Sequence, residues 1–283
     1  SDGQLLTSTG SGVAWEDAPA GGPTFKTFGT SSIMIGDDAT GTIDAANYNT
    51  GLGIDVFAAL TSGDSNTAVG TFALTANTTG SNNTALGYGT LYATTTGQDN
   101  VAVGYGTLLA NSTSSYNTGI GWNALNSNTT ASFNTSMGYA SLDANTTGAY
   151  NTAMGRLALF SNTTASNNTA VGYQALYSNT TGDNNVAVGL GSLLSNTTAN
   201  NNTVIGRDAG YTNTTGANNA IMGRNAAYYN TTGTYNVALG MSALQSNTTA
   251  SENAAVGYTA LYSNTTGAAN TAVGYQAGYT NTT

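Results

Sequence analysis

The sequence predicts an all-β fold, a parallel β-roll or β-solenoid built from about fifteen coils of 17 residues each. The first observation is a glycine that recurs every 17 residues with no insertion. The second is an apolar residue directly before each of these glycines, and the third is an asparagine four residues before nearly all of them. Self-similarity at a fixed period is the signature of units that stack in one direction. The recurring glycine stands at Gly36, Gly53, Gly70, Gly87, Gly104, Gly121, Gly138, Gly155, Gly172, Gly189, Gly206, Gly223, Gly240, Gly257 and Gly274.

We number the repeat from residues 168–184, NTAVGYQALYSNTTGDN, so that Asn168 is position 1 and Gly172 is position 5. Residues at the same position of successive units form what we call a column. Position 4 is apolar in every unit, and positions 2 and 4 share one face of an extended chain, so we expect a short strand with that face inward. Position 9 is mostly leucine and is expected to close the coil, as a second short strand or as one helical turn. Val171 and Leu176 are then the core pair of the reference unit.

The glycine at position 5 has no substitute in any unit, so we expect a positive φ or a close approach of another backbone there. Position 15 alternates between glycine, as at Gly182, and alanine, which predicts a small-residue turn without positive φ. Positions 1 and 12 are nearly always asparagine, as at Asn168 and Asn179, and stacked coils would align these amides into hydrogen-bonded ladders. The structural glycines expected in the regular part are Gly87, Gly104, Gly121, Gly138, Gly155, Gly172, Gly189 and Gly206.

The chain divides into two parts. Residues 1–31 do not fit the period, contain both prolines, and are expected to form a separate N-terminal segment or neck. Residues 32–283 are the repetitive shaft, and within it the units of residues 32–65 are degenerate, which is typical of a capping unit that covers the end of a core. Because the chain starts abruptly and stops within a unit, we expect it to be a piece of a longer protein.

Composition excludes several classes of function. The chain has a net charge of −9 and four basic side chains, which disfavours nucleic acid and anionic membrane surfaces as partners. It has no His and no Cys, which excludes zinc sites of the usual kind, Ser–His triads and disulfides. No apolar run approaches ~20 residues, so we expect no membrane insertion in this segment. We expect no enzyme activity, no metal and no cofactor.

The units resemble two groups of repeat proteins. N-T-A-V-G looks like the head repeats of trimeric autotransporter adhesins, and NTAVGYQALYSNTTG is similar to repeats of phage tail fibres and related bacterial surface proteins. The opening DGQLLTSTGSGVAWED is similar to segments that precede such repeats in tail fibres. The resemblance implies a homotrimeric fibre, an extracellular, virion or cell-surface location, and a host-attachment role. The thin core of a coil also favours winding several chains together. Burial of so few apolar side chains barely offsets the entropy cost of ordering the residues of the coil, and contact between chains would bury further surface.

Three alternatives follow for the function of the shaft. It is the structural fibre that projects a receptor-binding tip, or an adhesin whose repeats bind host matrix or glycans, or an ice-binding solenoid. Ice binding is disfavoured, because adjacent threonines in a strand point to opposite faces. Aromatic columns at positions 6 and 10 could stack on sugar rings or pack along the rod; the arginines at position 6 could stack on neighbouring tyrosines. The N-T-T triplets match glycosylation sequons, which an Asn-rich turn produces automatically. The candidate glycan-stacking residues are Tyr173, Tyr177, Tyr258 and Tyr262.

Overall fold

A computed structural model describes residues 4–9, 12–17, 24–28, 32–36 and 46–282. The N-terminal strands β1 (Gln4–Thr9) and β2 (Gly12–Asp17) form an antiparallel pair. A second antiparallel pair, β3 (Thr24–Phe28) and β4 (Ser32–Gly36), adds to the end of the main sheet, where β4 runs parallel to β5. The expected boundary between neck and shaft near residue 31, and much of the first degenerate unit, lie outside the described residues.

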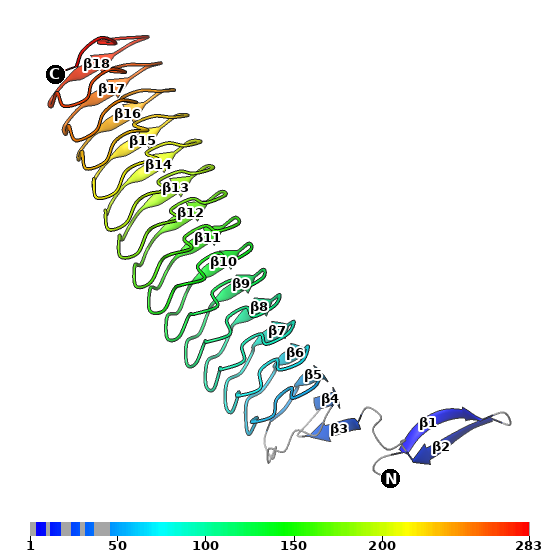
Figure 1. Ribbon diagram of the computed structural model, residues 1–283. Helices are drawn as coiled ribbons and strands as arrows, with labels where there is room; N and C mark the ends of the chain where they lie inside the picture. The colour runs from blue at the N-terminus through cyan, green and yellow to red at the C-terminus, as the bar shows by residue number, and fades with distance from the viewer. Residues whose placement is uncertain (1–3, 10–11, 18–23, 29–31, 37–45, 283) are drawn as a thin grey trace.

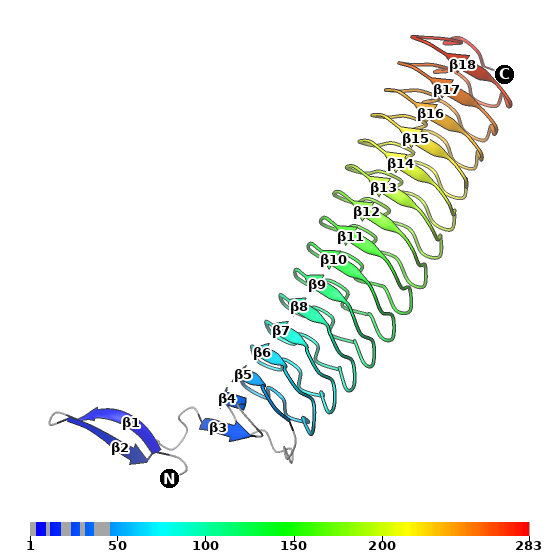
Figure 2. The same ribbon diagram turned by 180° about the vertical axis from the view of Figure 1, so that it is seen from behind.

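The shaft is a continuous stack of coils, each of which contributes one strand to a single parallel sheet (Figure 1). Figure 2 shows the same stack from behind, with the turns of each coil carrying the chain from one strand to the next along one axis. Within the parallel strands, each paired residue lies opposite its equivalent 17 residues further along the chain, for example Ala170 opposite Ala187. The parallel β-solenoid predicted from the period is therefore the observed fold. Its strands are β5 (Thr50–Gly53), β6 (Thr67–Val69), β7 (Thr84–Leu86), β8 (Val101–Val103), β9 (Thr118–Ile120), β10 (Thr135–Met137), β11 (Thr152–Met154), β12 (Thr169–Val171), β13 (Val186–Val188), β14 (Thr203–Ile205), β15 (Ala220–Met222), β16 (Val237–Leu239), β17 (Ala254–Val256) and β18 (Thr271–Val273).

The inward face of each strand is the opposite of the predicted one. Ala170 at position 3 is fully buried, whereas Val171 at position 4 is only partly buried and lies on the outer face of the sheet. The physical reason is the asparagine at position 1: Asn168 is fully buried, and side chains alternate along a strand, so position 3 must also point inward. Val171 is therefore not a core residue, while Leu176 is.

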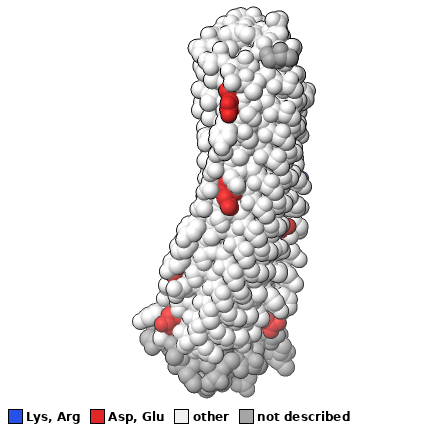
Figure 3. Space-filling view, turned by 90° about the vertical axis from the view of Figure 1, so that its left-hand side faces the viewer, with Lys and Arg blue, Asp and Glu red and all other residues white. Residues whose placement is uncertain are grey.

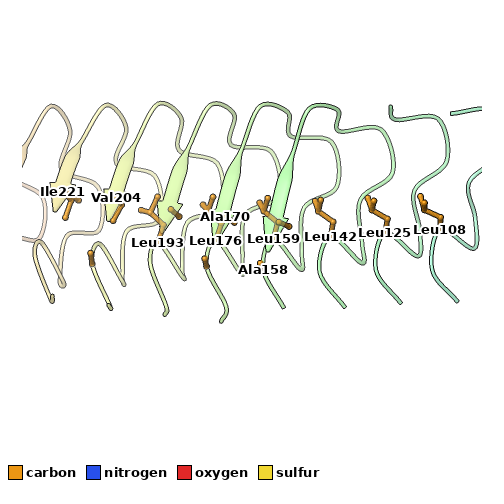
Figure 4. Close-up of a cluster of buried hydrophobic side chains, with 14 of the residues drawn as sticks. Leu108, Leu125, Leu142, Ala158, Leu159, Ala170, Leu176, Leu193, Val204 and Ile221 are labelled. Carbon is orange, nitrogen blue, oxygen red and sulfur yellow. The ribbon is translucent and has the colours of Figure 1, made fainter. Parts of the chain in front are cut away.

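The core is a single file of leucines flanked by small residues (Figure 4). Leucine at position 9 fills the coil, and alanine, serine or threonine at positions 3 and 8 leaves room for it. In two units a smaller residue at position 9 occurs with a larger one at position 3: Gly210 occurs with Val204, and Ala227 occurs with Ile221. A β-carbon on Gly210 would lie 3.6 Å from Cγ1 of Val204, which shows that the larger side chain occupies the space of the missing leucine.

The segment around position 9 is neither a second strand nor a helical turn. It is a run of turns in which Gln174 and Leu176 adopt positive φ, 57° and 52°, and it bends the chain sharply back toward the sheet. Left-handed leucine costs about 1–2 kcal/mol. Neighbouring coils still hydrogen-bond here, as N–H of Leu176 donates to the carbonyl of Ser192 at 3.0 Å. Burial of the leucine and this bond offset the strain, so the prediction of a second strand was wrong.

Two asparagine ladders run through the stack, as predicted. At position 12, Nδ2 of Asn179 donates to Oδ1 of Asn162 in the preceding coil and to the carbonyl of Gly182, both at 3.0 Å. At position 1 the main link is different: the backbone N–H of Asn185 donates to Oδ1 of Asn168 at 2.9 Å. These asparagines are buried, and the ladders supply partners for most of their amide groups, although Nδ2 of Asn168 has none.

Both expected reasons for the position-5 glycine hold. Gly172 has φ 138°, and a β-carbon there would lie 2.5 Å from the carbonyl oxygen of Gly189 in the next coil. Gly182 at position 15 has no positive φ, as predicted, but a β-carbon would lie 2.3 Å from the carbonyl oxygen of Ala199. Coils that carry alanine at position 15, such as that of Ala165, bury it.

Candidate functional site

The outer face of the parallel sheet is a partly exposed, uncharged stripe, which we call the outer stripe and define as the residues at positions 2 and 4 of β5–β18; position 2 is mostly threonine. Its position-4 members are apolar in every coil, and Met154 is 41% exposed. Sequence reasoning found the apolar column but assigned it to the interior. Figure 3 shows one face of the rod, on which acidic side chains are isolated and most of the surface is uncharged. The position-4 members are Leu52, Val69, Leu86, Val103, Ile120, Met137, Met154, Val171, Val188, Ile205, Met222, Leu239, Val256 and Val273.

Beside the outer stripe, position 6 forms a ring stack along the rod. Tyr88 stacks on Tyr105 with centroids 5.1 Å apart, and the stack continues through Trp122 to Tyr139. Arg156 then lies between Tyr139 and Tyr173, 5.5 and 5.4 Å from the two ring centroids. A guanidinium between two rings gains cation–π attraction on both sides. Arg156 therefore stacks on neighbouring tyrosines as expected.

Arg207 behaves differently from Arg156. Its Nε lies 3.1 Å from Oδ2 of the adjacent Asp208, in a salt bridge on the surface. The residues before and after it in the position-6 column are Leu190 and Arg224, which offer no ring in that column. An exposed pair of this kind contributes at most about 1 kcal/mol.

The four tyrosines predicted to stack on glycans lie in two columns. Tyr173 and Tyr258 belong to position 6, and Tyr177 and Tyr262 to position 10. Each has one ring face covered by a neighbouring coil: Tyr173 by Arg156, and the other three by a parallel ring. The ring partners are Phe160 for Tyr177 at 5.3 Å, Tyr275 for Tyr258 at 5.3 Å, and Tyr279 for Tyr262 at 5.1 Å. One face of each of these rings is therefore closed to a sugar.

Sequence reasoning missed a third ring column, at position 17. Tyr116, Phe133 and Tyr150 occupy this position in successive coils and stack with centroids 5.0 and 5.1 Å apart. All three are about half exposed. Their spacing of 17 residues was the available signal, but it covers only three coils in a row and is easily lost among polar neighbours.

The threonine pairs at positions 13 and 14 lie in a bend of the chain instead of in a strand. Position 13 is mostly half-buried, and its hydroxyl is bonded to the next coil: Oγ1 of Thr180 donates to the carbonyl of Thr197 at 3.1 Å. Position 14 is an exposed threonine in every described coil from Thr79 to Thr266. The argument against ice binding assumed that the pair lies in a strand, and that assumption was wrong.

The asparagines of the N-T-T triplets are hidden inside the folded coil. Asn128, Asn145 and Asn179 have no exposed surface, and their amides are bonded within the position-12 ladder. A glycan cannot be attached to these amides without opening the coil.

One acidic residue lies in an unusual place. Asp143 occupies position 10, between Asn126 and Phe160 in the column, and its Oδ1 is buried without a hydrogen-bond partner. Burial raises the pKa of Asp143 above its ordinary value, because desolvation disfavours the charged form. The described part of the chain contains no group of three or more His, Cys, Asp and Glu side chains that could hold a metal ion.

Comparison with known proteins adds no relative. No protein-family model matches the chain, and no curated protein or solved structure matches it. Within the described residues, no helix is long and apolar enough to cross a membrane.

Proposed function

We propose that this chain is the structural shaft of a surface-displayed filament, a phage tail fibre that projects a receptor-binding tip toward a host. The observation that carries the proposal is the outer stripe, an uncharged face whose position-4 column is apolar in every coil of β5–β18. Large contiguous apolar surfaces are rare on isolated soluble proteins and mark interaction sites. A shaft is the simplest use of a rod whose surface features repeat without any irregular cleft.

The partner that fits the outer stripe is further copies of the same chain, wound as a homotrimer. The stripe is roughly 60 Å long, for thirteen steps of ~4.8 Å, and about 10 Å wide across two side-chain columns. It therefore offers on the order of 600 Å² per chain, comparable with the ~800 Å² per partner of a standard stable interface. Identical columns on each chain meet without like-charge repulsion, since positions 2 and 4 carry no charged residue in the described coils.

Assembly and location are tested separately. Analytical ultracentrifugation of the purified chain should give a mass of three chains; a folded monomer at micromolar concentration contradicts the trimer. Antibodies against the rod should label filaments on intact particles or cells in electron micrographs. Label confined to the cell interior contradicts the shaft function.

A second candidate is an adhesin whose repeats bind host glycans, and the exposed threonine column at position 14 favours it. The exposed columns at positions 6 and 17 vary from coil to coil, whereas position 14 is threonine in every coil from Thr79 to Thr266. A glycan array probed with the intact rod tests this candidate. Binding that is lost when Thr164, Thr181 and Thr198 are changed to valine supports it, and no binding on any glycan contradicts it. Tyr173, Tyr177, Tyr258 and Tyr262 would then supply ring edges at neighbouring columns.

A further inference from the structure

Pairs of tyrosines lie face to face across neighbouring coils at several places on the rod surface. The ring centroids of Tyr88 and Tyr105 are 5.1 Å apart with the planes 7° from parallel. Two further pairs join the same two coils near the end of the described chain. Tyr258 and Tyr275 are 5.3 Å apart, and Tyr262 and Tyr279 are 5.1 Å apart.

The solenoid register produces this arrangement. Both tyrosines of a pair occupy the same position of consecutive units, so the stack of coils brings their rings side by side although they are 17 residues apart in sequence. The rings are also accessible: Tyr105 is 51% exposed and Tyr275 is 73% exposed. Exposed rings can rotate about χ1 and χ2 to bring the carbons next to their hydroxyl groups into contact. The chain contains 17 tyrosines and no cysteine, so disulfides cannot cross-link its coils.

We propose that these stacked pairs are sites of oxidative coupling, at which a one-electron oxidant joins neighbouring coils through dityrosine. A haem peroxidase with hydrogen peroxide is an oxidant of the required class. Each phenol gives up one hydrogen atom and becomes a phenoxyl radical. The two radicals combine at the ring carbons ortho to oxygen, forming one C–C bond. The hydrogens on those carbons then move to the oxygens and restore both hydroxyl groups. The two hydrogen atoms removed reduce one peroxide to two waters.

The coupled pairs would act as staples between coils. A bond between Tyr258 and Tyr275 closes a loop of 17 residues, and a bond between Tyr262 and Tyr279 closes a second across the same two coils. Closing loops of this size restricts the unfolded chain, which is the main way a cross-link stabilises a fold.

The chain contains a matched control. Phe160 and Tyr177 stack in the same geometry, 5.3 Å apart and 7° from parallel, but phenylalanine has no hydroxyl hydrogen to give up. Tyr48 and Tyr235 provide the opposite control. They are 62% and 61% exposed, more than Tyr88, yet no stacked ring partner is found for them among the described residues. Stacking and exposure therefore make different predictions about which tyrosines react.

The test treats the purified full chain with haem peroxidase and hydrogen peroxide. Tandem mass spectrometry of its fragments should show links between Tyr88 and Tyr105, and between the two pairs near the end of the chain. Each link should lower the mass by two hydrogen atoms and add dityrosine fluorescence, and the treated chain should melt at a higher temperature. Tyr105→Phe should remove one link, and Phe160→Tyr should add a new one to Tyr177.

Three results would overturn the proposal: links that involve mainly Tyr48 and Tyr235, links only between chains, or a Phe160→Tyr variant that folds and gains no link. Circular dichroism before oxidation establishes that each variant is folded. None of these results depends on what the filament attaches to, so the shaft function stands or falls on its own experiments.

Discussion

Thr94 interrupts the run of asparagines at position 12, and it leaves Oδ1 of Asn77 in the preceding coil buried without a hydrogen-bond partner. From Asn111 to Asn247 the next asparagine of the position-12 ladder donates to this oxygen, as Asn145 does to Asn128 at 2.9 Å. Thr94 instead donates its hydroxyl to the carbonyl of Asn111 at 3.0 Å. The ladder is interrupted here at a single rung.

Thr94→Asn should therefore stabilise the protein. The new Nδ2 would reach Oδ1 of Asn77, and the new Oδ1 would accept from Asn111, so a buried acceptor gains its partner. We expect a gain of about 1 kcal/mol in the free energy of unfolding. Urea titration followed by circular dichroism measures it.

The reciprocal change supplies the control. Asn162→Thr should strand Oδ1 of Asn145, which now accepts from Asn162 at 2.8 Å, and should destabilise the rod by a similar amount. A destabilised Thr94→Asn variant would mean that the ladder does not tolerate a full amide at that rung.

Glycines at positions 5 and 15 should differ in their tolerance of alanine. Gly172→Ala combines a strained φ with a contact 2.5 Å from the backbone of the next coil, and should cost at least about 2 kcal/mol. Gly182→Ala meets a similarly close oxygen at an ordinary φ, so it should cost about 1 kcal/mol or less rather than nothing. Melting temperatures decide between them, and equal losses would contradict the distinction.

The outward orientation of position 4 has a direct test. Val171→Asp places a charge on the outer face and should change the stability of one chain by about 0.5 kcal/mol or less. Ala170→Asp, one residue earlier, buries an unpaired carboxylate and should prevent the coil from closing. If Val171→Asp unfolds the chain, the orientation described above is wrong. In the trimer, Met137→Asp with Met154→Asp should also lower association, which ultracentrifugation measures on a chain that stays folded.

Asp143 should make the rod more stable in acid than at neutral pH. Its pKa is raised in the folded state, so its carboxyl binds a proton more tightly there than in the unfolded chain. In the unfolded chain an aspartate carboxyl has a pKa of about 3.9. The resulting stabilisation is fully present below the pKa of the unfolded chain, where the carboxyl is protonated in both states. It is lost as pH rises through the pKa of the folded state. Asp143→Asn should remove this dependence and raise stability at pH 7. Urea titrations of both proteins at acidic and neutral pH measure the difference, and parallel pH profiles would contradict the assignment.

The sequence was enough to predict the solenoid, the obligatory glycine and the ladders, because each leaves a column that is visible without coordinates. It was misleading about which face is inside. Hydrophobicity alone predicts that valine at position 4 points inward and that asparagine at position 1 points outward. The reverse holds, and only the ladder bonds of Asn168 explain why the asparagine is the buried residue. The left-handed Leu176 could not be anticipated either, since leucine rarely adopts that conformation. The trimer remains a prediction.

The repeated register of the coils also bears on how the rod changes over generations. Removing residues 168–184 would join Asn167 to Asn185, restore every column, and shorten the rod by ~4.8 Å. Near-identical units in a gene recombine unequally, and each such event adds or removes whole coils while the fold is preserved. The length of the rod can thus change in fixed steps of one coil, and no new interaction between residues is needed.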